Sequence, residues 1–97
     1  MAEVNVIDWH IHPFRVDRWY AAWKPALDRA GSYGATSVSL TRSEDDPLAF
    51  RQTTVWESRA DFDRYWASDE VSAAREAALS WYNKPLLPSW HVVVSAT

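Results

Sequence analysis

Residues 53–78, with the sequence TTVWESRADFDRYWASDEVSAAREAA, carry the change from strand to helix on which the fold prediction rests. Their first residues are β-branched and lead to Trp56, which is typical of a β-strand. Ser58 followed by Asp61 has the form of a helix capping box, and Ser68 with its acidic neighbours repeats this start signal. The stretch therefore predicts a strand and then two helical segments. The faces that we expect these segments to bury are Phe62, Tyr65 and Trp66 in the first and Val71, Ala74, Arg75, Ala78 and Tyr82 in the second.

The chain before this stretch predicts a strand, a helix and a β-hairpin. Residues 4–12 alternate between two sides, with Ile7, Trp9 and Ile11 on one and Val6, Asp8, His10 and His12 on the other. Residues 16–30 predict an amphipathic helix that Pro25 kinks or breaks. Its expected inner stripe is Val16, Tyr20, Trp23, Leu27 and Ala30. Residues 34–42 and 48–57 predict two antiparallel strands joined by the polar turn at residues 43–47.

The last predicted strand is residues 90–96, WHVVVSA, which completes a recognisable order of elements. Strand, helix, strand, strand, helix, strand is the βαββαβ order of the α+β ferredoxin-like fold with a four-stranded antiparallel sheet. Right-handed crossovers place the last strand beside the first, and the third strand on the other side of the first. Helices cover one face of such a sheet, yet several strands carry apolar residues on both faces. We therefore expect a homodimer, with two sheets packed face to face around a cavity.

Length and composition limit the remaining possibilities. Ninety-seven residues, 47% hydrophobic and 24% charged, predict one globular domain over residues 1–97. A formal net charge of −3 provides no field that attracts phosphate backbones, so we expect no nucleic acid partner. The absence of cysteine excludes disulfides and thiolate metal sites. Without an apolar run of membrane-spanning length or a basic leader, we expect no membrane partner and a cytoplasmic location.

Tryptophan is the unusual feature of the composition, with seven residues in this short chain. So many indoles indicate either a large aromatic core or the walls of a pocket for a flat ligand. A small aromatic molecule is therefore the partner that we expect besides a second copy of the chain.

Residues 42–79 resemble the antibiotic biosynthesis monooxygenase family of the dimeric α/β-barrel superfamily, through the strand ending in Trp-Glu-Ser, the Ser-Asp helix start and the Ala-rich helix. The resemblance implies site residues. In quinone-forming members, an Asn and a Trp on the third strand correspond to Gln52 and Trp56, and an Arg on the Ala-rich helix corresponds to Arg75. The position of the family's Tyr holds Phe62, with Tyr65 one turn away.

The haem-degrading members of the superfamily imply a cofactor that this chain does not match. Their Trp corresponds to Trp66, but their haem-ligating His corresponds to Arg75, and a guanidinium cannot ligate iron. We therefore expect no cofactor.

Three histidines are further candidates for chemistry. His10 and His12 lie on one side of the first predicted strand, and His91 lies on its expected neighbour. The three imidazoles can bind a metal, one can act as a general base oriented by Asp8, or all can be solvated. The sequence leaves these three interpretations open.

Arg75 lies on a stripe that we expect to be buried, and a buried guanidinium needs an anion. The anion is either Asp8, Asp69 or Glu76 of the same chain, or a phenolate or carboxylate of a bound molecule.

The resulting hypothesis is an enzyme that resembles the cofactor-independent monooxygenases, which oxidise polyphenolic aromatics to quinones. The predicted catalytic residues are His10, Asp8 and Arg75, and the predicted substrate-binding residues are Gln52, Trp56, Trp66, Phe62, Tyr65 and His12. The hypothesis requires that both sets face one cavity in the dimer. The alternatives are an isomerase or mutarotase in the same cavity and a non-catalytic dimeric protein that binds a ligand.

Overall fold

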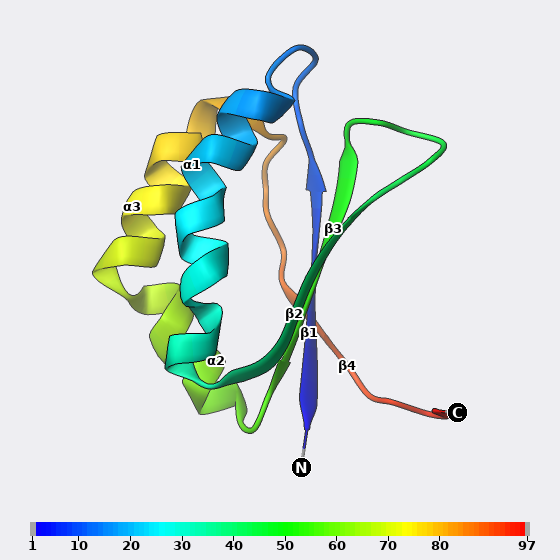
Figure 1. The fold of residues 1–97 in the computed structure, drawn as a ribbon, viewed down its shortest axis with the longest axis vertical. Helices are drawn as coiled ribbons and strands as arrows, with labels where there is room; N and C mark the ends of the chain where they lie inside the picture. The colour runs from blue at the N-terminus through cyan, green and yellow to red at the C-terminus, as the bar shows by residue number, and fades with distance from the viewer. Residues whose placement is uncertain (1, 97) are drawn as a thin grey trace.

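The computed structural model describes residues 2–96 and has the predicted order of elements (Figure 1). They are β1 (Glu3–His10), α1 (Val16–Arg29), the 3-10 helix η1 (Ala30–Tyr33), β2 (Ala35–Arg42), β3 (Ala49–Trp56), α2 (Arg59–Ala67), α3 (Asp69–Ala78), the 3-10 helix η2 (Leu79–Trp81) and β4 (Ser89–His91). Within residues 2–96, no helix combines the length and the apolar character needed to cross a bilayer.

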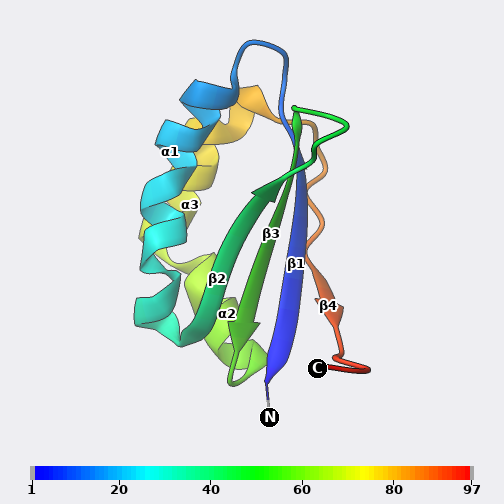
Figure 2. The same ribbon diagram turned by 45° about the vertical axis from the view of Figure 1, so that its right-hand side comes forward.

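The strands form one four-stranded antiparallel sheet in the order β2-β3-β1-β4, which confirms the predicted ferredoxin-like topology. Helices α1, α2 and α3 all cover the same face of this sheet (Figures 1 and 2). We call that face the helix face and the opposite one the open face. The core lies on the helix face, where alternate residues of β1, including Ile7 and Trp9, are buried.

Helix α1 buries a stripe that differs from the predicted one. Trp19, Trp23 and Ala26 face the core, whereas Tyr20 remains 41% exposed. The prediction for Tyr20 was therefore wrong, because a chain with this many aromatics contains two overlapping stripes at helical spacing. The helix also continues through Pro25 without a break. Since Pro25 is exposed, the carbonyl group that its missing N–H leaves free lies at the solvent side of the helix.

The two predicted helix starts are confirmed. The Ser58 hydroxyl accepts a hydrogen bond from the Asp61 N–H at 3.3 Å, and the Ser68 hydroxyl accepts one from the Val71 N–H at 3.3 Å. Each serine thus satisfies a backbone donor that the first turn of its helix cannot.

The last strand is much shorter than predicted. β4 ends at His91, which pairs with Val4 near the start of β1. Residues 92–96 therefore continue past the end of their neighbouring strand and have no ladder to join. In consequence Val92, Val93 and Val94 are 82%, 60% and 92% exposed.

Candidate functional site

The strand register separates the predicted site residues into two groups. Ile7 pairs with Gln52, and Asp8 pairs with Arg51. Gln52 therefore lies on the helix face with Trp56, whereas Asp8 lies on the open face. The expectation that both groups face one cavity is corrected by this register, because neighbouring residues of a strand point to opposite sides of a sheet.

The first group lies between the sheet and the helices and forms one aromatic cluster. The Trp56 ring centroid is 5.5 Å from that of Phe62 and 5.3 Å from that of Tyr65. Phe62 stacks on Trp66 at 5.6 Å, and the Arg75 guanidinium lies 4.5 Å from the Trp66 ring centre. The residues carried over from the family resemblance are thus brought together by β3, α2 and α3.

Gln52 is the polar centre of this region and is fully buried. Its Oε1 accepts a hydrogen bond from the Trp23 indole N–H at 2.8 Å and a longer one from the Trp9 indole N–H at 3.4 Å. Its Nε2 has no partner among residues 2–96. The amide is therefore held in one orientation by α1 and β1, with its N–H donors free for another molecule.

Asn5 belongs to the same region, although the sequence analysis did not select it. It lies on β1 opposite Thr54 of β3 and Trp90 of β4, and it is fully buried. In the described part of the chain, neither its Oδ1 nor its Nδ2 has a hydrogen-bond partner. The available signal was its position, because Asn5 shares the side of the strand that carries Ile7 and Trp9.

Thr54, beside Asn5, is already engaged. Its hydroxyl oxygen accepts a hydrogen bond from the Trp56 indole N–H at 2.7 Å. That bond holds Trp56 as a wall of the region, with its only polar atom satisfied.

Arg75 is the charged group of this region. Its Nη2 donates to the Trp66 carbonyl oxygen at 3.0 Å and to the Ser72 hydroxyl at 3.2 Å. Its Nε is buried and has no partner within residues 2–96, and no carboxylate among these residues forms an ion pair with it. The expected pairing with Asp8, Asp69 or Glu76 is therefore absent from the described chain.

Two tyrosines show the electrostatics around this cation. Burial raises the pKa of the Tyr82 phenol, and the positive charge of Arg75 acts against that increase. Burial also raises the pKa of Tyr65, whose hydroxyl donates to the Ala26 carbonyl oxygen at 2.7 Å. Tyr65 thus serves as a neutral donor that ties α2 to α1, whereas Arg75 already favours the charged form of a nearby phenol.

The second group lines a groove of about 480 Å³ on the open face. The His10 Nε2 is 3.0 Å from an Asp46 carboxylate oxygen, and its Nδ1 is 3.1 Å from the Asn83 amide nitrogen. Asp8 instead accepts two hydrogen bonds from Arg51, at 2.8 and 3.2 Å. The carboxylate that orients His10 is therefore Asp46 and not Asp8, and both ring nitrogens of His10 are engaged.

The hairpin carboxylate that binds His10 is held by the backbone as well. The Leu48 N–H donates to Asp46 at 3.0 Å, and this bond, followed by the bond from His10, lowers the pKa of Asp46. Sequence reasoning could not select Asp46 among the acidic residues of the turn.

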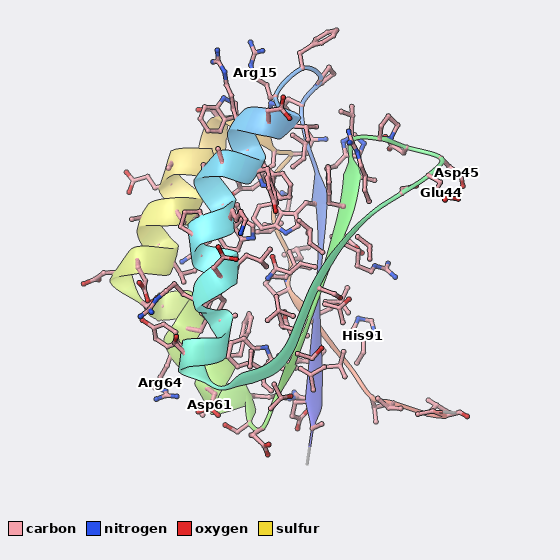
Figure 3. The ribbon with its side chains drawn as sticks, viewed as in Figure 1. Arg15, Glu44, Asp45, Asp61, Arg64 and His91 are labelled. Atoms are coloured by element: carbon pink, nitrogen blue, oxygen red, sulfur yellow. The ribbon has the colours of Figure 1, made fainter. Side chains whose placement is uncertain are left out.

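The other histidines lie apart from His10. His91 pairs opposite Val4, at the far end of β1 from His10, and Figure 3 shows it on the open side of the sheet. His12 is half-buried beyond β1, and its backbone N–H donates to the Trp81 carbonyl oxygen at 2.9 Å. The three imidazoles therefore do not converge, and residues 2–96 contain no group of three His, Asp or Glu side chains placed to hold a metal ion.

Comparison with known proteins agrees with this geometry. The family model described as "Antibiotic biosynthesis monooxygenase" matches residues 4–77. No curated protein matches the chain. Three solved structures share its fold. A protein from Nitrosomonas europaea named after the same family has a TM-score of 0.87 at 14% identity, covering 99% of this chain and 93% of its own. Another structure titled antibiotic biosynthesis monooxygenase has 0.83 at 16%, covering 98% and 100%. The protein Rv0793 from Mycobacterium tuberculosis has 0.84 at 13%, covering 99% and 98%.

Proposed function

The chain belongs to the antibiotic biosynthesis monooxygenase family, and from this premise we propose that it is a cofactor-independent monooxygenase that oxidises a polyphenolic aromatic molecule to a quinone. The substrate binds between the sheet and the helices, beside Arg75. The observation that carries the proposal is the guanidinium of Arg75, which packs on an aromatic ring without a carboxylate among residues 2–96. A cation in such surroundings is complementary to an anionic aromatic ligand.

Arg75 supplies the step that activates the substrate. A free phenol has a pKa of about 10, so little phenolate exists at neutral pH. A positive charge beside the hydroxyl lowers that pKa, as Arg75 does for the Tyr82 phenol. The proton passes to water, and the electron-rich phenolate remains bound to the guanidinium.

The phenolate then reacts directly with O₂. One oxygen atom replaces a ring hydrogen ortho or para to the phenolate and becomes the second carbonyl oxygen of the quinone. The other oxygen atom leaves as water with the ring hydrogen and the phenolic hydrogen. The substrate loses four electrons and O₂ gains four, so the reaction needs no other reductant.

The surrounding residues bind and orient the substrate. The free Nε2 of Gln52 donates to a substrate oxygen, while its Oε1 stays fixed by Trp23. Trp56 and Trp66 form aromatic walls on either side of Phe62. His10 and Asp8 lie on the open face, so the proposal gives them no part in this reaction.

The proposal is tested with Arg75→Met, which keeps the length of the side chain and removes the charge. Oxygen consumption is measured with a panel of dihydroxynaphthalenes and dihydroxyanthracenes. We expect kcat/KM to fall by about 100-fold, since removing one partner of a buried charge pair costs about 2–5 kcal/mol. Arg64→Met is the matched control, because Arg64 is exposed and pairs with Asp61 on the outer side of α2.

Three results would contradict the proposal. The first is an Arg75→Met protein that stays folded and keeps full turnover and affinity. The second is equal turnover without O₂, which would support the isomerase or mutarotase alternative. The third is binding without turnover across the whole panel, which would support a non-catalytic binding protein.

We also propose that a second copy of the chain covers the open face. Val4, Val6 and Val55 form an apolar centre on this face, and the exposed Val92–Val94 segment lies at the same end. The charges beside this centre are internally paired, as Asp8 with Arg51 and His10 with Asp46. Identical faces of this kind meet without net repulsion, which suits a two-fold symmetric dimer.

Sedimentation of the wild type and of Val6→Lys tests the dimer. We expect the wild type to sediment at twice the chain mass at micromolar concentration and Val6→Lys to sediment as single chains, because two lysines would meet at the centre of the interface. Asp63→Lys, on the exposed side of α2, is the control and should stay dimeric. A wild-type monomer at this concentration would contradict the proposal.

A further inference from the structure

We propose that Asn5 is a specificity-determining residue that binds a hydroxyl group and an adjacent carbonyl oxygen of the substrate. The site then selects a partly oxidised aromatic molecule over a simple polyphenol. This inference rests on the proposed function and narrows its substrate class.

The position of Asn5 is the first argument. It is fully buried on the helix face, at the centre of a sheet where an apolar residue would pack without loss. Its amide offers a donor and an acceptor side by side, and both lack a partner among residues 2–96. Buried polar groups are almost always hydrogen-bonded in native proteins, so an amide with two unpaired atoms indicates a ligand that pairs with them.

The neighbours of Asn5 are already engaged elsewhere. The Thr54 hydroxyl oxygen, directly across on β3, accepts from Trp56 at 2.7 Å. The Gln52 Oε1, one pair further along the sheet, accepts from Trp23 at 2.8 Å. Trp90, across on β4, offers an indole N–H and no acceptor. The side chains around Asn5 are thus committed in the arrangement that the fold provides.

A count of the unpaired groups gives the chemistry of the ligand. The Asn5 Nδ2, the Gln52 Nε2 and the Arg75 Nε are free donors, whereas the Asn5 Oδ1 is the one free acceptor in this set. A complementary ligand therefore carries several acceptor oxygens and at least one hydroxyl. A simple polyphenol carries as many O–H donors as oxygens, whereas a hydroxyl beside a carbonyl matches the amide of Asn5 on both of its atoms.

The spacing also fits a flat molecule. Asn5 and Gln52 are diagonal neighbours on β1 and β3, and such positions lie about 7–8 Å apart. A skeleton of two fused aromatic rings can bridge them, with its outer oxygen atoms reaching toward Arg75.

The test compares two probes that share one skeleton. One is a naphthoquinone with a hydroxyl group beside a carbonyl, and the other is a dihydroxynaphthalene. Their affinities are measured from the quenching of tryptophan fluorescence in the wild type, Asn5→Leu, Asn5→Ala and Arg75→Met. Asn83→Leu is the control, because Asn83 binds His10 on the open face.

We expect the wild type and Asn83→Leu to bind the hydroxynaphthoquinone at least about tenfold more tightly than the dihydroxynaphthalene, because a site built for a polar group rejects the analogue that lacks it. Both Asn5 variants should lose this preference and still bind the two probes through Arg75. Two Asn5 variants of different size keep the test valid if one of them packs poorly.

The outcomes separate this inference from the proposed function. If the Asn5 variants keep the wild-type preference while Arg75→Met loses binding of both probes, the role of Asn5 is wrong and the proposed function stands. If Arg75→Met binds both probes as the wild type does, the site itself is wrong and the inference fails with it.

Discussion

On the open face of the sheet, the charged groups of the groove all have partners, whereas on the helix face several polar atoms have none. Asp8 is bound by Arg51, and His10 is bound by Asp46 and Asn83. On the other face, Asn5 and the Nε of Arg75 are buried without a partner among residues 2–96. Exposed pairs contribute little to stability, but unpaired buried groups are costly. The comparison teaches that the groups with chemistry in reserve lie inside, under the helices.

The largest expected difference between the two faces is in stability. Ile7→Ala should lower the free energy of unfolding by about 2–5 kcal/mol, because Ile7 is fully buried in the core. Val6→Ala, one residue earlier and on the open face, should lower it by less than about 1 kcal/mol at concentrations where the chain is monomeric. Urea denaturation measures both. Equal losses at the two positions would mean that the faces do not differ as described.

A smaller effect of opposite sign is expected at Asn5. Asn5→Leu should raise the free energy of unfolding of the ligand-free protein by about 1–3 kcal/mol, because it replaces two unpaired buried atoms with apolar ones. Thr54→Val, across the sheet, should lower it by about 1–3 kcal/mol, because it leaves the Trp56 indole N–H without its acceptor. Thermal unfolding of both variants gives the comparison. If Asn5→Leu were as destabilising as Thr54→Val, Asn5 would be paired in solution.

The smallest effect concerns the pH dependence of the open face. The bonds from Leu48 and His10 lower the pKa of Asp46 in the folded protein. A carboxylate with a lowered folded pKa stabilises the protein above its ordinary pKa, and this contribution disappears as the pH falls through the folded value. Asp46→Asn should therefore lower Tm slightly at about pH 7 and not at about pH 2. Asp45→Asn, in the same turn, is the control, and an equal shift there would contradict the assignment.

Much of the fold was accessible from local patterns. The serines at 58 and 68 begin α2 and α3 as predicted, and the alternation along β1 identified its buried residues. The order of elements was sufficient for the sheet topology, because crossover handedness leaves few arrangements. The predictions failed where the signal depended on neighbours, as for Tyr20 and for the end of β4.

The candidate site was predictable only in part. Gln52, Arg75 and the aromatic residues of β3 and α2 were selected correctly as a group that lies together, through the resemblance to the family. Asn5 was missed because an asparagine in a strand carries no local signal of burial. Asp8 was preferred to Asp46 as the partner of His10 because it is closer in sequence, although the hairpin brings Asp46 within 3.0 Å.

The amino-acid sequence by itself determined the element types, their order and the family, because these follow from spacings of a few residues and from short motifs. The tertiary structure alone decided which polar atoms find partners. Strand register assigns each side chain to one face, and packing then either satisfies its hydrogen bonds, as for Thr54, or leaves them open, as for Asn5. Both depend on contacts between residues far apart in the chain, which no local pattern encodes.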